Sequence, residues 1–146
     1  MKPQVSCYCN TKMDTKDLTP EERKNIEGLN YLTWDMFDSP GEPGSGYNFM
    51  EREPVLILDQ IVHKTRRFLN VELGYVSKIY ADKNSFPTKD SHRVGKAIRL
   101  RIVGPRKRMA IIKELILFGV ERIAVDRETV YFDTDDLKPP QFALWT

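Results

Sequence analysis

The stretch from Ser91 to Ile102 constrains the fold most, because it indicates a loop, a glycine turn and then a strand. After Gly95 the residues alternate between aliphatic and mostly charged side chains, which is the period of a strand with two different faces. One face carries Lys96, Ile98, Leu100 and Ile102, and the other carries Ala97, Arg99 and Arg101. We therefore expect a strand at 96–103 that turns its aliphatic face toward a core.

Two long helices are predicted on either side of this strand. Pro54 begins the first, about 54–69, and Gly104 with Pro105 begins the second, which Gly119 ends as a C-cap. The apolar positions of the first are Leu58, Ile61, Val62, Thr65, Phe68 and Leu69, and those of the second are Met109, Ile112, Leu115, Ile116 and Phe118. Both sets recur at the spacing of a buried helix face.

The remaining segments predict a small sheet and long connections. Residues 71–76 predict a strand, and 122–125 with 129–133 predict a hairpin. Residues 32–37 indicate one helical turn, and Thr19-Pro20 begins a short helix that ends near Gly28. The segments 38–48, 77–90 and 134–146 are predicted to be loops. The order predicts an α+β domain at 19–146, in which a small, mostly antiparallel sheet packs with two long helices, after a flexible N-terminal arm at 1–18.

Charge and apolar content limit the possible partners. The chain has 146 residues and a net charge of +2, which does not by itself favour nucleic acid or a membrane. No apolar run has the length of a membrane span, and the polar start Met1–Gln4 lacks the apolar region of a signal peptide, so we expect synthesis in the cytoplasm. Cys7 and Cys9 are too close for an unstrained bridge and too few for a zinc site. We expect free thiols, with an intermolecular disulfide or an ordered contact as the alternative.

His92 and Arg99 have the spacing of a metal site that contains an unsuitable residue. A histidine just before a strand, with a side chain seven residues later on that strand, is how small zinc hydrolases assemble two ligands. Here the seventh residue is Arg99. A guanidinium group stays charged and offers no lone pair to a metal. The stretch therefore indicates the frame of a metal site that has lost a ligand.

Six separated pieces of the chain carry a family resemblance. They are Phe37-Asp38-Ser39-Pro40 with Gly44-Ser45-Gly46, Leu58-Asp59, Gly74-Tyr75, Ser91-His92 with Gly95 and Ala97, Tyr131-Phe132-Asp133, and Leu144-Trp145. In this order they resemble the zinc D-alanyl-D-alanine carboxypeptidases and related peptidoglycan peptidases, especially their short phage-encoded branch. The resemblance covers about residues 30–146 and implies the fold that this family shares with the Hedgehog signalling domain.

The resemblance places three residues at the zinc-ligand positions of the family. His92 stands at the first ligand, Arg99 at the carboxylate ligand and Tyr131 at the second histidine ligand. A catalytic zinc needs three protein ligands and an open position. Only His92 is retained, and Tyr131 would have to ligate as a phenolate, so we expect no metal, no other cofactor and no enzymatic activity. The alternative for His92 is a plain loop histidine with one hydrogen bond.

Three further positions correspond to substrate binding and proton transfer. Val76 stands where the family has the arginine of Gly-Tyr-Arg, which holds the substrate. Glu128 has the spacing that some members use for the general base, and Asp133 remains from the His-x-Asp pair. We expect no catalytic residue among them. Our hypothesis is that Glu128 and Asp133 hold Arg99, near the Tyr131 hydroxyl, in a cluster that braces the sheet.

These expectations favour a non-catalytic domain used as a structural or assembly component. The resemblance implies a bacteriophage particle, so that the protein is made in the host cytoplasm and becomes virion-associated. The alternatives are a peptidoglycan-binding module and a still-active zinc peptidase. The arm and two basic runs would contact other proteins of an assembly; the runs are Lys64, Arg66 and Arg67, and Arg99, Arg101, Arg106, Lys107 and Arg108. Few aromatics lie among the runs, so nucleic acid is not expected as a partner, nor is a membrane.

Overall fold

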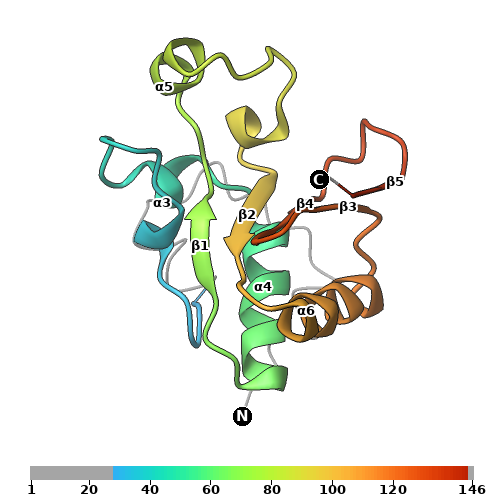
Figure 1. Ribbon diagram of the computed structural model, residues 1–146. Helices are drawn as coiled ribbons and strands as arrows, with labels where there is room; N and C mark the ends of the chain where they lie inside the picture. The colour runs from blue at the N-terminus through green and yellow to red at the C-terminus, as the bar shows by residue number, and fades with distance from the viewer. Residues whose placement is uncertain (1–27, 145–146) are drawn as a thin grey trace.

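A five-stranded sheet organises residues 28–144, which are the residues that this computed structural model describes. The strands are β1 (Asn70–Leu73), β2 (Ala97–Arg101), β3 (Arg122–Val125), β4 (Thr129–Asp133) and β5 (Gln141–Leu144). They lie in the order β1-β2-β4-β3-β5, and each neighbouring pair is antiparallel except β3 and β5, which are parallel (Figure 1). The predicted α+β class and the mostly antiparallel sheet are confirmed.

Two long helices pack with one face of the sheet. They are α4 (Arg52–Thr65) and α6 (Pro105–Leu117). The strand β2 contributes Ile98 and Leu100 to the core, both fully buried, while Arg101 on the opposite face is exposed. The alternation predicted for this strand is therefore confirmed. The rest of the core comes from α4, α6 and the β3–β4 hairpin, through Val55, Leu58, Ile61, Ile111, Leu115, Ile123, Val130 and Phe132.

The helix α4 ends earlier than the predicted helix 54–69. Arg66 adopts a left-handed conformation with φ 57°, and its N–H donates to the carbonyl of Val62, so the chain turns away there. Leu69 is buried beyond the turn, whereas Phe68 is 89% exposed. The placement of Phe68 on a buried helix face was wrong, because a left-handed residue ends the helical spacing on which it depended.

The helix α6 begins at the predicted proline and buries the predicted Ile112 and Leu115, but Ile111 joins them in place of Met109 and Ile116. Ile111, Ile112 and Leu115 point into the core. Met109 and Ile116 are 65% and 57% exposed, so their predicted burial was wrong. They are seven residues apart and lie together on an adjacent stripe of the helix, which is turned away from the sheet.

Segments predicted as loops contain short elements. The predicted turn at 32–37 is the 3₁₀ helix η2 (Trp34–Phe37), which is confirmed. The others are α3 (Ser45–Phe49), α5 (Lys78–Lys83), η3 (Ser91–Val94) and the strand β5. Side-chain caps explain two of them, because the Ser77 hydroxyl accepts the N–H of Tyr80 and the Asp90 carboxylate accepts that of His92.

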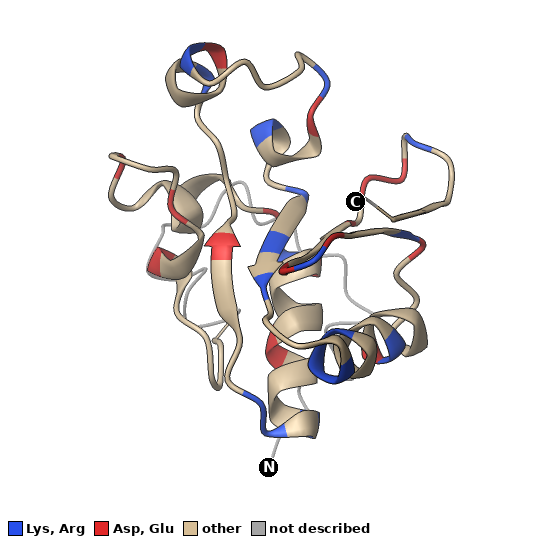
Figure 2. Ribbon diagram, in the orientation of Figure 1, with Lys and Arg blue, Asp and Glu red and all other residues tan. Residues whose placement is uncertain are grey.

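Several sequence predictions lie outside the described residues. They concern the arm at 1–18, Cys7 and Cys9, the helix that begins at Thr19, and Trp145. Within residues 28–144, none of the helices has both the length and the apolar content that crossing a membrane requires. Lys and Arg positions, coloured blue in Figure 2, occur at the lower end of α4 and on α6.

Candidate functional site

His92 is held in a rigid and fully enclosed position. It lies in η3, is 1% exposed, and its ring nitrogen Nδ1 is 2.7 Å from the carbonyl oxygen of Gly74, to which it donates. This bond makes Nε2 the acceptor nitrogen of the neutral ring. Nε2 is buried and has no hydrogen-bond partner among the residues that the structure describes. Burial lowers the pKa of His92, against the opposing effects of the hydrogen bond to Gly74 and the charge of Asp90, so the ring is neutral at pH 7.

Two glycines of the family-like pieces allow the segments around His92 to approach closely. Gly95 ends η3 with φ +72°, and a Cβ there would lie 2.1 Å from the main-chain oxygen of Phe49. A Cβ on Gly74 would lie 2.7 Å from Cα of Phe37. The N–H of Tyr75 donates to the Phe37 carbonyl at 2.9 Å. The pieces at 37–46, 74–75 and 91–95 are therefore neighbours in space.

Val76 cannot take the role of a substrate-gripping arginine. It is fully buried, packs with Leu73 and Ala81, and donates its N–H to the His92 carbonyl at 3.1 Å. The side chain of Val76 therefore lies in the interior, where it contributes to packing. It offers no charge to a ligand.

Arg99 and Tyr131 are directly paired across β2 and β4. The Tyr131 ring contacts the His92 ring edge-on, with the ring centroids 5.5 Å apart. The three positions that the resemblance assigns to zinc ligands therefore lie in one neighbourhood. The sheet brings two of them together by register, and η3 adds the third.

Tyr131 is engaged as a neutral hydrogen-bond donor. Its hydroxyl donates to Oδ2 of Asp133 at 2.5 Å. Burial, together with the hydrogen bond to the carboxylate of Asp133, raises the pKa of the Tyr131 phenol far above its ordinary value. A phenolate ligand at this position is therefore strongly disfavoured at neutral pH.

Asp133 is braced by Arg122, a residue that the sequence interpretation did not select. Arg122 Nε donates to Oδ1 of Asp133 at 2.8 Å, and the side chain of Asp133 is 0% exposed. Arg122 also reaches the carbonyl of Pro139 and the side-chain oxygen of Gln141, just before and within β5. It therefore joins β3, β4 and β5 through one guanidinium group.

The predicted cluster around Arg99 was wrong. Arg99 makes no ion pair with Glu128, Asp133 or any other described residue. Glu128 pairs with Arg101 at 2.9 Å, and both side chains are about half exposed, at 53% and 44%. The cause is register, since Arg101 lies opposite Thr129 next to Glu128, whereas Asp133 lies opposite Arg122 on β3.

This donor set does not fit zinc. A site would need three ligands with available lone pairs. His92 Nε2 is one such donor, but Arg99 contributes a positive charge, and Asp133 already accepts from Arg122 and Tyr131. Within residues 28–144 no group of three His, Cys, Asp or Glu side chains is placed to hold a metal ion. His92 therefore lies beside the Arg99–Tyr131 pair, but these residues do not offer three ligands to a metal ion.

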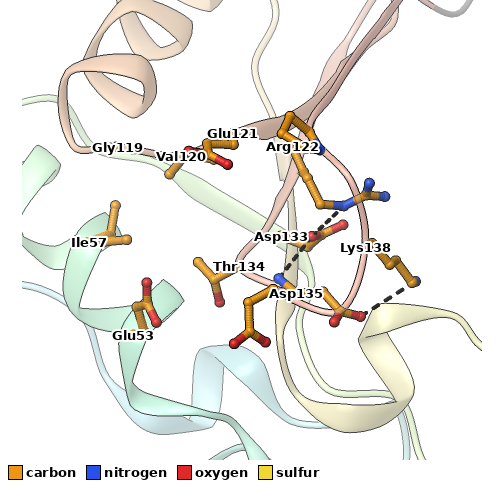
Figure 3. Close-up of a pocket in the computed structure, with 12 residues that line it drawn as sticks. Glu53, Ile57, Gly119, Val120, Glu121, Arg122, Asp133, Thr134, Asp135 and Lys138 are labelled. Carbon is orange, nitrogen blue, oxygen red and sulfur yellow. Dashed lines mark hydrogen bonds and ion pairs between the residues drawn. The ribbon is translucent and has the colours of Figure 1, made fainter.

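A pocket lies on the other side of the Arg122–Asp133 pair. It has a volume of about 340 Å³ and lies between the start of α4, residues 119–122 and the segment 133–140 (Figure 3). Glu53, Asp135 and Lys138 are among the residues that line it. The Ser91 hydroxyl donates to Asp135 at 2.9 Å, and Lys138 Nζ donates to that hydroxyl at 2.7 Å. These two hydrogen bonds connect the loop after β4 to the segment that contains His92.

Sequence reasoning missed Arg122, Ser91 and Lys138, although one signal was present. The predicted hairpin at 122–125 and 129–133 already implies that residues 122 and 133 pair at its open end. The ion pair between residues 122 and 133 could therefore have been predicted from the sequence.

Comparison of the chain with protein-family models, with curated proteins and with solved structures gives no match.

Proposed function

We propose that this chain is a catalytically inactive member of the D-alanyl-D-alanine carboxypeptidase family with the Hedgehog-type fold, and that it serves as a structural or assembly component of a bacteriophage particle. The observation that carries the loss of catalysis is the pairing of Arg99 with Tyr131 beside His92. A permanent cation and a neutral phenol stand where a zinc peptidase needs two ligands.

The arrangement of the family-like pieces supports the proposed fold. The segments at 37–46, 74–75, 91–97 and 131–133 are far apart in the sequence, yet they meet around His92 through hydrogen bonds and close glycine contacts. Asp59, in another such piece, accepts the N–H groups of residues 30–32 at 2.9–3.0 Å. The phage assignment rests on the resemblance to the phage-encoded branch.

A peptidoglycan-binding role receives less support. Recognition of a peptide carboxylate needs an accessible cation, and Val76 supplies a buried aliphatic side chain at the family position for it. Without that cation, the ancestral binding mode loses its strongest contact.

Zinc content tests the loss of catalysis. We expect far less than one zinc per chain in protein purified without chelator, and an unchanged thermal melt after EDTA. Cross-linked stem peptides should remain uncut. One equivalent of zinc, together with cleavage, would overturn the proposal.

A restored ligand set gives the sharper test. In the double variant Arg99→Asp with Tyr131→His, three ligands would again face one position, so we expect about one zinc per chain and a melt that EDTA lowers. The matched control is Arg101→Asp with Tyr131→His, which makes the same change of charge two residues further along β2, on the same face of the strand, and should bind no zinc. If neither variant binds zinc, residues 92, 99 and 131 are not arranged around one position as proposed.

Mass spectrometry of purified bacteriophage particles tests the assembly role. The proposed role is refuted if the chain is absent from the particles.

A further inference from the structure

Two turns lie together at one end of the sheet. The first connects α4 to β1, and the second connects β2 to α6. Asn70 pairs with Arg101 in the β1–β2 ladder, so the segments just before Asn70 and just after Arg101 emerge side by side. Figure 1 shows both connections at the end of the sheet opposite α5.

Each of these segments exposes a large apolar side chain. Phe68 on the first turn is 89% exposed, Val103 on the second turn is 62% exposed, and Met109 in α6 is 65% exposed. A hollow of about 220 Å³ lies beside Phe68, and apolar Leu32, Val62 and Leu69 help to line it. A contiguous exposed apolar patch marks a contact surface, and the Asn70–Arg101 pairing brings the Phe68 and Val103 segments side by side.

The same two segments are strongly cationic. Residues 63–69 and 101–113 contain eight Lys and Arg residues and no Asp or Glu; these are Lys64, Arg66, Arg67, Arg101, Arg106, Lys107, Arg108 and Lys113. Lys64 is neutralised by Glu114 at 2.6 Å, and Arg101 by Glu128. Arg67, Arg106, Lys107 and Lys113 are exposed and have no ion pair among the described residues. Figure 2 shows Lys and Arg positions in blue at the lower end of α4, on β2 and on α6, in a chain whose net charge is +2.

We propose that this end, defined by residues 66–68, 103 and 105–113, docks on an anionic lipid surface. Phe68, Val103 and Met109 would enter the boundary between headgroups and acyl chains, while the four cations that have no ion pair within residues 28–144 would contact headgroup phosphates. The proposal departs from the expectation of no membrane partner, which rested on overall charge and on apolar runs. It goes beyond the proposed function and does not depend on the state of the His92 site.

A lipid surface fits the apolar residues better than nucleic acid does. Single-stranded nucleic acid is bound by aromatic rings that stack on bases, combined with cations. Here two of the three exposed apolar side chains are Val103 and Met109, which have no ring to stack. The lipid boundary takes up aliphatic and aromatic side chains alike, so it accounts for all three.

Vesicle sedimentation tests this inference with the full chain. We expect binding to vesicles of phosphatidylcholine mixed with phosphatidylglycerol, little binding to phosphatidylcholine alone, and weakening by added salt. Each cation at such a surface contributes about fivefold in affinity, so Arg67→Gln should weaken binding by about that factor. Phe68→Ser should weaken it by about tenfold or more.

Leu137→Ser is the matched control. Leu137 is 87% exposed, close to the 89% of Phe68, but it lies in the loop after β4 beside two aspartates. The control should bind as the parent does, and thermal melts should show all three variants folded. Equal binding to neutral and anionic vesicles, or unchanged binding of Phe68→Ser, would overturn the inference. So would binding to a single-stranded DNA oligonucleotide with no binding to the vesicles.

Discussion

Arg122→Ala is the substitution that best tests how the sheet is braced. Removal of one partner from a buried ion pair costs about 3–5 kcal/mol, because the other charge is left without compensation. The side chains of Arg122 and Asp133 are 14% and 0% exposed. The Tyr131 hydroxyl and the N–H of Asp135 remain on Asp133 in the variant, so we expect the lower end of the range, about 3 kcal/mol. For a chain of this length, that corresponds to a fall in Tm of about 9 °C.

Two other arginines on the same face of the sheet serve as controls. Arg99 has no ion pair among the described residues, and the pair of Arg101 with Glu128 is about half exposed. Exposed pairs contribute less than about 1 kcal/mol, so Arg99→Ala and Arg101→Ala should stay within that limit. Urea unfolding followed by the fluorescence of buried Trp34 measures all three variants on the same scale.

A double-mutant cycle separates the ion pair from the other contacts of Arg122. Asp133→Asn removes the charge and keeps the shape, and the cycle with Arg122→Ala should give a coupling free energy of about 2 kcal/mol. The reasoning is refuted if Arg99→Ala destabilises the protein as much as Arg122→Ala does. It is also refuted if the coupling free energy is close to zero.

Three further predictions concern the surroundings of the site. Gly95→Ala should cost about 3 kcal/mol or more in unfolding experiments, because its Cβ would overlap a main-chain oxygen 2.1 Å away, whereas Gly119→Ala, with φ +86° and open space, should cost only about 1 kcal/mol. Asp59→Ala should remove the acceptor of three N–H groups, and hydrogen exchange should show lost protection at Leu32. Burial lowers the pKa of His92, so the unfolded chain takes up the proton first, and stability should fall as the pH drops below about 6.5. Urea midpoints measured across that range should lose this part of the pH dependence in His92→Gln, and an unchanged dependence would contradict the assignment.

Elements that depend on local pattern could be predicted from the sequence. The alternation in β2 places Ile98 and Leu100 in the core whatever the rest of the fold is, and Pro105 marks the start of α6 by its own geometry. Short elements were missed where one capping side chain decides the structure. The Ser77 hydroxyl begins α5 within a polar segment that has no helical apolar spacing.

The charge pairing at the site could not be predicted from one strand alone. The position of Arg99 on the open face follows from alternation, but whether a carboxylate meets it depends on the registers of β2 with β4 and of β4 with β3. Those registers place Arg122 opposite Asp133 and leave Glu128 beside Arg101. The placement of Phe68 failed for a related reason, because a left-handed Arg66 cannot be identified from helical spacing.

The contacts of Arg122 with Pro139 and Gln141 also set an order of assembly for the sheet. The β3–β4 hairpin is local in sequence and forms early, whereas β5 reaches β3 only after residues 126–140 have passed between them, so its closure is slower. We expect Arg122 to be positioned by the hairpin first and then to contact β5 through the oxygen atoms of Pro139 and Gln141. Since β5 is an edge strand with mostly exposed residues, we also expect it to open locally while the hairpin stays closed.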